Sequence, residues 1–118
     1  MPAGKLKLPP IEKGATYTHT LTWKDSTNTP INLTGCTAKL QARPDASSAI
    51  VLVELSTTNN RIVITPLEGK IQLYISDEDT TTIQGLGGVY DLEIYHPNGY
   101  TTRLLEGKWS FKPEVTRV

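Results

Sequence analysis

The chain has 118 residues, with 12 basic and 12 acidic side chains and a formal net charge of zero. This length suffices for one domain with a hydrophobic core, and the balanced charge excludes the basic excess by which nucleic-acid binders neutralise phosphates. A single cysteine, Cys36, excludes an intrachain disulfide, and no apolar run is long enough to cross a bilayer or to serve as a signal peptide. We therefore expect a protein made in a reducing cytoplasm, which neither inserts into membranes nor binds nucleic acid. If it acts outside the producing cell, we expect it to leave by lysis or within a particle.

Residues 1–10 form the first segment, and they combine three prolines, two lysines and a glycine without any periodicity. The pair Pro9-Pro10 favours an open, extended backbone and blocks a helix. We predict an extended N-terminal arm that is either disordered or laid on a neighbouring protein. For the free protein, the favoured prediction is that residues 1–10 are disordered.

The clearest pattern of the chain is the alternation of threonine with larger side chains over residues 16–23. Successive side chains of a strand point to opposite faces, so the pattern predicts a strand over about residues 15–23. One face carries the large residues, and the other carries threonines that meet either solvent or another subunit. The large residues are Tyr17, His19, Leu21 and Trp23. A polar loop follows at 24–30, and a short extended piece at 31–33.

The middle of the chain continues with strand patterns. Residues 36–43 alternate and predict a strand whose inward side chains are Cys36, Ala38, Leu40 and Ala42. Residues 50–55 are apolar on both faces, which predicts a central or covered strand. Residues 61–65 and 71–75 alternate on either side of a tight turn and predict a hairpin.

One short helix and a second hairpin complete the expected elements. Ser76 is a suitable N-cap, and three acidic residues at 77–79 suit the first turn of a helix. Threonines and glycines that follow predict that this helix ends after about one turn. Residues 89–95 and 100–111 predict a hairpin around a turn at 96–99, with a β-bulge at Gly107.

These elements sum to about seven or eight strands with regularly spaced turns, which predicts an all-β fold. We expect an antiparallel immunoglobulin-like β-sandwich with one short helical turn. The expected organisation is the arm at 1–10, the β-sandwich domain at 11–113 and a C-terminal tail at 114–118.

Candidate catalytic and metal-binding residues are scattered along the sequence. His19 and His96 have no partners at the spacing of zinc ligands, and residues 77–79 lack the alternating oxygen ligands of an EF-hand. Asp91 and Glu93 share a predicted strand face with Tyr95, as paired acids of an enzyme can, but a solvated sheet face has the same pattern. No serine stands in a nucleophile motif. We predict no enzyme, no cofactor and no catalytic, cofactor-binding or metal-binding residue.

Several other residues have structural interpretations. Cys36 is expected to be a small buried apolar residue and not a nucleophile. The glycine-rich segment 85–88 precedes a strand, in contrast to a phosphate-binding loop, and is expected to be a connector. Trp23 and Trp109 are expected in the core. Three tyrosines are expected to face outward, where their rings would suit a protein interface or a sugar-binding platform. They are Tyr74, Tyr95 and Tyr100.

A series of short motifs occurs in order along residues 11–117. They are Lys13-Gly14, Trp23-Lys24-Asp25, Pro30-Ile31, Asn32-Leu33-Thr34-Gly35, residues 38–44, 69–73 and 88–93, and Leu105-Glu106-Gly107-Lys108-Trp109 with residues 113–117. In this order the motifs resemble a family of small structural proteins of tailed bacteriophages and prophages. They also resemble, more distantly, the immunoglobulin-like N-terminal domain of phage baseplate upper proteins. Asn32 stands where the family usually has an acidic residue. Any receptor-binding module is expected on another polypeptide.

The resemblance implies a non-enzymatic virion component of the tail, baseplate or fibre attachment. The expected partners are other virion proteins, in a symmetric homo-oligomer or ring, with contacts made by the arm, the tail and an exposed sheet edge. Two alternatives remain open at this stage. One is a capsid decoration or head–neck protein, and the other is a carbohydrate-binding module for host-surface glycans.

Overall fold

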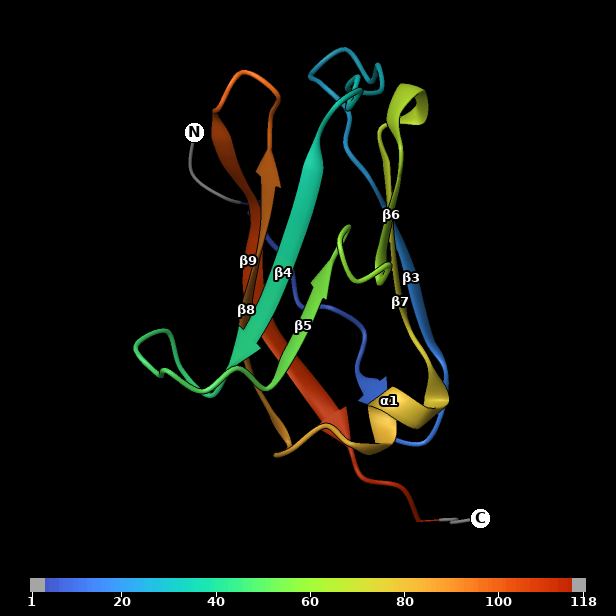
Figure 1. The fold of residues 1–118 in the computed structure, drawn as a ribbon, viewed down its shortest axis with the longest axis vertical. Helices are drawn as coiled ribbons and strands as arrows, with labels where there is room; N and C mark the ends of the chain where they lie inside the picture. The colour runs from blue at the N-terminus through green and yellow to red at the C-terminus, as the bar shows by residue number, and fades with distance from the viewer. Residues whose placement is uncertain (1–3, 116–118) are drawn as a thin grey trace.

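The structure is a computed structural model that describes residues 4–115, and it consists of two β-sheets packed face to face (Figure 1). In chain order the strands are β1 (Gly4–Lys5), β2 (Ile11–Glu12), β3 (Tyr17–Thr22), β4 (Thr37–Arg43), β5 (Val53–Ser56), β6 (Ile62–Thr65), β7 (Lys70–Ile75), β8 (Gly87–Tyr95) and β9 (Thr101–Lys112). A 3-10 turn, η1 (Pro66–Glu68), and a short helix, α1 (Asp77–Thr81), complete the regular structure of the described residues. The predicted all-β sandwich is confirmed.

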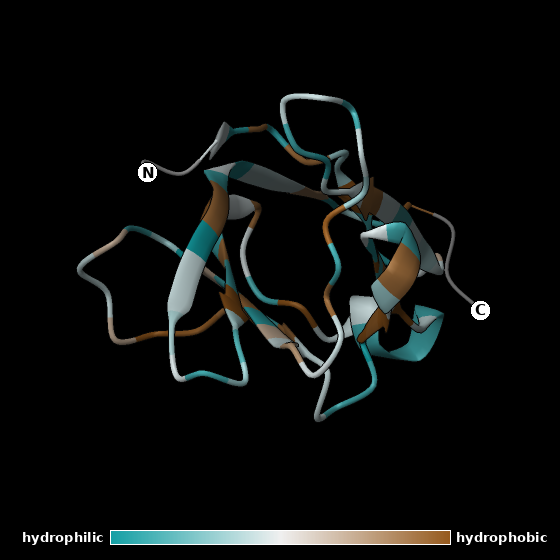
Figure 2. Ribbon diagram, turned by 90° about the horizontal axis from the view of Figure 1, so that it is seen from above, coloured by the Kyte–Doolittle hydropathy of each residue, from teal (hydrophilic) through white to brown (hydrophobic). Residues whose placement is uncertain are grey.

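The larger sheet has the strand order β1-β9-β8-β4-β5, and β2 also runs along β9. The smaller sheet has the order β3-β7-β6. Both predicted hairpins are present, one formed by β6 and β7 and the other by β8 and β9. Seen from above, the strands surround a central region that the buried side chains fill (Figure 2).

The smaller sheet shows why the threonine alternation matters. β3 pairs antiparallel with β7, so that Tyr17 lies opposite Ile75 and Leu21 opposite Ile71. Tyr17 is buried, whereas the threonines at 18, 20 and 22 are exposed on the other face. Since side chains alternate along a strand, the strand puts its large residues into the sandwich. Within residues 4–115 nothing covers its threonine face.

Trp109 on β9 lies at the centre of the core and is 1% exposed. Its ring meets three other aromatic rings edge to face, with centroid separations of 5.6 Å to Tyr17, 5.9 Å to Tyr90 and 5.8 Å to Phe111. Edge-to-face contacts of this kind are favourable because the ring edge is positive and the face negative. The expectation for Trp23 needs correction, because its ring is half-buried and packs only against the margin of the core.

Helix α1 begins as the sequence predicts and lies between β7 of the smaller sheet and β8 of the larger sheet. The Ser76 hydroxyl accepts a hydrogen bond of 3.2 Å from the Asp79 backbone N–H, which caps the helix. Thr80 is buried, and its hydroxyl donates to the Ala15 carbonyl at 2.9 Å and accepts from the Gly14 N–H at 3.1 Å. The helix therefore holds the chain where it enters β3.

Residues 4–12 of the N-terminal segment run along β9 of the larger sheet. β1 and β2 pair in parallel with β9, with Gly4 opposite Leu105 and Ile11 opposite Phe111. Leu8 is 1% exposed and belongs to the core. The packing was not predicted because Leu6 and Leu8 alternate with lysines over too few residues to indicate a strand. Residues 1–3 and 116–118 of the predicted arm and tail lie outside the described residues.

The prediction for residues 50–55 was wrong. Ile50 is 64% exposed and Val51 is 40% exposed, in the loop that projects between β4 and β5 (Figure 1). Only Val53 and Leu55 are buried, because β5 is an edge strand that turns one face to the core. A continuous apolar run matches a covered strand, but here half of the run belongs to an exposed loop.

The predicted bulge at Gly107 is also absent from that position. The register between β8 and β9 shifts beside Leu92, where Leu105 and then Arg103 take successive places opposite β8. Gly107 has a different role, since a Cβ atom there would lie 2.1 Å from the Leu6 carbonyl oxygen. The glycine is needed because the arm runs directly against β9 at this point.

Candidate functional site

The outer face of the larger sheet carries a polar hollow with a volume of about 650 Å³. Its floor spans β4, β8 and β9, and the pairing of these strands places Gln41 opposite Asp91 and Asp91 opposite Glu106. The principal lining residues are Gln41, Arg43, Asp91, Glu93, Arg103 and Glu106. Acids therefore lie at the centre of the hollow with arginines on either side.

Asp91 lies on β8 in the floor of the hollow, beside both acidic and basic side chains. Burial raises the pKa of its carboxyl, the nearby Glu93 charge adds to the increase, and the Arg103 guanidinium opposes it from 3.5 Å. Glu106 differs, since a hydrogen bond of 2.7 Å from Lys5 lowers the pKa of its carboxyl. The carboxyl pKa values of Asp91 and Glu106 are therefore displaced in opposite directions, although the two residues lie on the same row of the sheet.

Hydrogen bonds among neighbouring side chains tie the rest of this face together. Arg43 donates to the Gln41 side-chain oxygen at 2.8 Å and to the Ser48 carbonyl at 2.7 Å. Gln41 donates in turn to Glu54 at 2.6 Å, and Tyr95 donates to Glu93 at 3.1 Å. The predicted common face of Asp91, Glu93 and Tyr95 is confirmed. A face of this kind provides polar groups for contact with another macromolecule.

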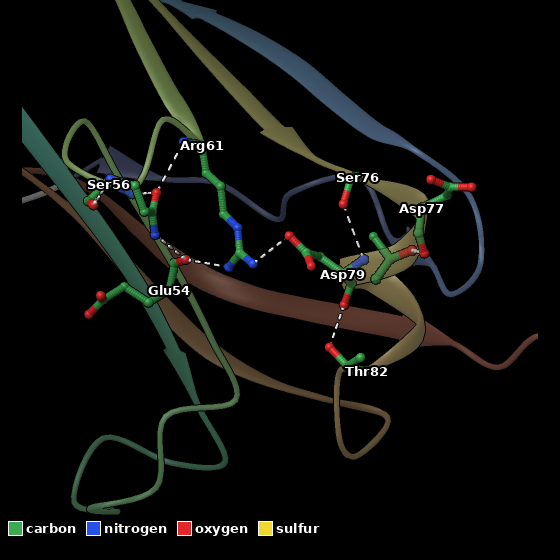
Figure 3. Close-up of polar contacts among 9 residues, drawn as sticks. Glu54, Ser56, Arg61, Ser76, Asp77, Asp79 and Thr82 are labelled. Atoms are coloured by element: carbon green, nitrogen blue, oxygen red, sulfur yellow. Dashed lines mark hydrogen bonds and ion pairs between the residues drawn. The ribbon is translucent and has the colours of Figure 1, made fainter.

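A second polar cluster closes the outer edge of β5, and Figure 3 shows it. The Glu54 carbonyl on this edge accepts hydrogen bonds from Arg61 at 2.9 Å and from the Asn59 amide at 3.1 Å. The Ser56 N–H, also on this edge, donates to the Asn59 side-chain oxygen at 2.9 Å. Two of the backbone groups that another strand could bind, the Glu54 carbonyl and the Ser56 N–H, are therefore already occupied.

Arg61 also connects the cluster to the helix. Its guanidinium lies 2.8 Å from the Asp79 carboxylate, and Figure 3 shows it between β5 and α1. The hydrogen bond and the charge of Arg61 hold the pKa of the Asp79 carboxyl below its usual range. The acidic segment 77–79 therefore serves the helix and this ion pair, and the described residues contain no group of three metal ligands there or elsewhere.

His96 and Cys36 meet, although sixty positions separate them. The Cys36 sulfur lies 3.6 Å from His96 Nδ1, and His96 Nε2 lies 2.9 Å from the Thr102 hydroxyl. The ring of Trp23 packs against the His96 ring at a centroid separation of 6.4 Å. Burial raises the pKa of the Cys36 thiol, which disfavours the thiolate that nucleophilic chemistry needs. Cys36 is half-buried, and not fully buried as the sequence predicted.

The predicted outward tyrosines have different surroundings. Tyr74 on β7 is 42% exposed and Tyr100 in the β8–β9 hairpin is 73% exposed, whereas Tyr95 is half-buried beside Glu93. Tyr74 and Tyr100 belong to different sheets. The exposed rings therefore do not line one common platform.

Comparisons with solved structures add to this description. The chain aligns over 98% of its length with 56% of a chain in a crystal structure of a chicken TCR, at 12% identity and a TM-score of 0.54. The fold is immunoglobulin-like. The strand order agrees with this, because β3, β7 and β6 take the places of strands B, E and D, and β4, β8 and β9 those of C, F and G. β5 extends the second sheet as strand C′ does in variable-type domains.

The immunoglobulin-like chain spans about half of the TCR chain, 56% of its length. A second similar structure, Tim-1, has 17% identity over 100% of this chain and 99% of its own, with a TM-score of 0.44. No protein-family model matches the sequence, and no curated protein matches it. Among the described residues, no helix is long and apolar enough to span a membrane.

Proposed function

We propose that this chain is a non-enzymatic structural subunit of a tailed-phage virion, in the tail, the baseplate or the fibre attachment, and that it assembles through protein–protein contacts. The motifs between residues 11 and 117 supply the phage assignment through their resemblance to small phage structural proteins. The structural observation that carries the assembly role is the unprotected edge of β3. Among the described residues β3 pairs only with β7, so its other edge is open to a strand of a neighbouring subunit.

The other surfaces suit a role in assembly. The polar hollow on the larger sheet presents acids and arginines side by side, a pattern that favours specific contacts with another protein surface. The zero net charge of the chain gives little repulsion between closely packed copies. The host cytoplasm is the proposed place of synthesis, and the virion is the proposed final location.

Localisation in the particle tests this proposal. A tagged copy of the chain is produced during the lytic cycle of the phage or prophage that encodes it, and purified virions are labelled with gold against the tag. Label at the tail or baseplate is the expected result. Label on the capsid or neck would support the alternative of a decoration or head–neck protein, and purified virions without the chain would contradict a virion role.

The carbohydrate alternative has less support from the geometry. A glycan platform needs aromatic rings gathered beside polar groups, but Tyr74 and Tyr100 lie on different sheets and Tyr95 is half-buried. A glycan array distinguishes glycan binding from a role in assembly alone. Binding to host glycans that is lost in a Tyr100→Ala variant would favour the carbohydrate function over simple assembly.

A further inference from the structure

The backbone of β3 has a free side whose groups can be assigned residue by residue. Trp23 N–H donates to the Gly69 carbonyl at 2.8 Å, at the end of the β3–β7 ladder. Alternate residues of an antiparallel strand bond to the same neighbour, so Leu21, His19 and Tyr17 also bond toward β7. The N–H and C=O groups of the intervening threonines at 18, 20 and 22 therefore point away from β7. No hydrogen bond among residues 4–115 occupies them.

The other outer strands of the sandwich are shorter or partly covered. β1 and β2 lie along parts of β9, and Asn59 and Arg61 occupy two backbone groups of β5. β6 is also an edge strand, but it has only four residues, and Pro66 follows it directly. Natural proteins protect open edges with lysine, proline or a bulge, and residues 17–22 contain no lysine, proline or register shift. This edge is therefore available to another strand.

The sequence of β3 is complementary to itself. When a second copy runs antiparallel with its Thr20 opposite Thr20, Thr18 meets Thr22 of the second copy and Thr22 meets Thr18 of the second copy. These are the residues whose backbone groups point outward, so each opposed pair exchanges two hydrogen bonds. Threonine pairs also interact favourably across strands. No charged side chain of residues 17–22 opposes one of like sign in this register.

We propose that two copies of this chain associate edge to edge through β3, across a two-fold axis at Thr20, to form one continuous sheet. The sheet takes β3, β7 and β6 from each copy. A two-fold contact uses the same edge of both copies, so the association closes at a dimer and does not grow into a fibre. This inference deepens the proposed function by naming the partner as a second copy, and it rests on assembly through protein contacts.

Disulfide capture in the purified full-length protein tests the register. A Thr20→Cys variant is made in a Cys36→Ser background, with Thr65→Cys in the same background as the control, because Thr65 is exposed on β6 at the far side of the sheet. Opposed residues in a hydrogen-bonded antiparallel pair are about 5.5 Å apart at Cα, within the reach of a disulfide. We expect an oxidised dimer for Thr20→Cys and almost none for the control. Equal yields from both variants, or no dimer from either, would overturn the proposal.

Charge substitutions supply a second measurement that does not depend on oxidation. We expect sedimentation velocity to show a monomer–dimer equilibrium that Thr20→Lys weakens roughly tenfold or more, because two ammonium groups would then oppose each other. Thr65→Lys is expected to leave the equilibrium unchanged, and a mixture of Thr20→Lys and Thr20→Glu is expected to restore a mixed dimer. Circular dichroism verifies that each variant is folded. A wild-type protein that stays monomeric at every concentration would overturn the dimer without affecting virion localisation, which is measured separately.

Discussion

The indole N–H of Trp109 donates a hydrogen bond of 2.9 Å to the carbonyl oxygen of Pro9. The Tyr17 hydroxyl donates to the same oxygen at 3.1 Å, and the Tyr90 hydroxyl donates to the Leu6 carbonyl at 2.6 Å. Three aromatic side chains of the core therefore bind the arm through its main chain. The side chains of Leu6 and Leu8 add apolar contacts with the core to these main-chain hydrogen bonds.

The Tyr90 hydroxyl can be removed without changing the shape of the ring. We expect Tyr90→Phe to lower the free energy of unfolding by about 1 kcal/mol, because the Leu6 carbonyl loses its donor. Faster tryptic cleavage at Lys5 and Lys7 should accompany this loss. Tyr100→Phe is the matched control, since that side chain is exposed in the β8–β9 hairpin. Equal protection of the arm in both variants would show that the hydrogen bond does not hold it.

Gly107 tests the close approach of the arm to β9. A Cβ atom at this position would lie 2.1 Å from the Leu6 carbonyl oxygen, which is backbone and cannot turn aside. We expect Gly107→Ala to destabilise the protein by roughly 1–3 kcal/mol, the range for overpacked sites. The control is Gly4→Ala, whose Cβ would meet the Leu105 side chain at 3.2 Å, a contact that a small side-chain movement relieves. Chemical denaturation of both variants makes the comparison.

Alkaline pH should destabilise the fold through two of the core tyrosines. Burial raises the pKa of Tyr17 and of Tyr90 to about 12. The unfolded chain ionises near the ordinary tyrosine value of about 10, so the folded state binds these protons more tightly. The resulting stability is complete below that value and is lost as pH rises from about 10 toward about 12. Denaturation measured across this window should show the fall, and a Tyr17→Phe, Tyr90→Phe double variant should reduce its slope.

Arg61 is expected to protect the β5 edge as well as to stabilise the fold. Arg61→Ala removes the donor to the Glu54 carbonyl and the partner of Asp79. We expect a loss of about 1 kcal/mol and a higher rate of aggregation at raised temperature, measured by light scattering. Lys70→Ala is a suitable control because the Lys70–Glu68 ion pair is well exposed, and such pairs contribute little. Similar aggregation of the two variants would contradict the protective role.

Asp91 provides a prediction for the polar hollow. Burial raises the pKa of its carboxyl, so the folded state holds the proton more tightly than the unfolded chain does. The charged form therefore costs stability at neutral pH, and that cost decreases as pH falls through the folded pKa. We expect Asp91→Asn to raise the melting temperature at neutral pH and to have a smaller effect in acid. Thermal unfolding followed at several pH values checks this dependence.

Strand positions were largely predictable from the sequence because alternation reports burial directly. Ile71, Leu73 and Ile75 on β7 are buried as their spacing requires, and Tyr90, Leu92 and Ile94 on β8 follow the same rule. The helix cap at Ser76 was equally predictable, since it depends on neighbours within one turn. These features depend on local chemistry, which the sequence contains in full.

Contacts that depend on the topology of the sheets could not be predicted from the spacing of apolar residues along the sequence. Cys36 and His96 meet only because β4 and β8 are neighbours. The run at 50–55 matched a covered strand because alternation is absent from it, and its exposure depends on where β5 lies in the sheet. The coverage of each sheet edge, which distinguishes β3 from β5, likewise depends on side chains that arrive from distant segments.

The parallel pairing of the arm with β9 has a consequence for biosynthesis. Gly4 lies opposite Leu105, so β1 leaves the ribosome long before the strand to which it binds. Contacts between such distant residues close large loops and slow folding. Until β9 emerges, Leu8 and the arm carbonyls remain in water, and the final closure of the sandwich is expected only after β9 has left the ribosome. A ribosome stalled before codon 101 should therefore hold a nascent chain whose lysines at 5 and 7 are still open to protease.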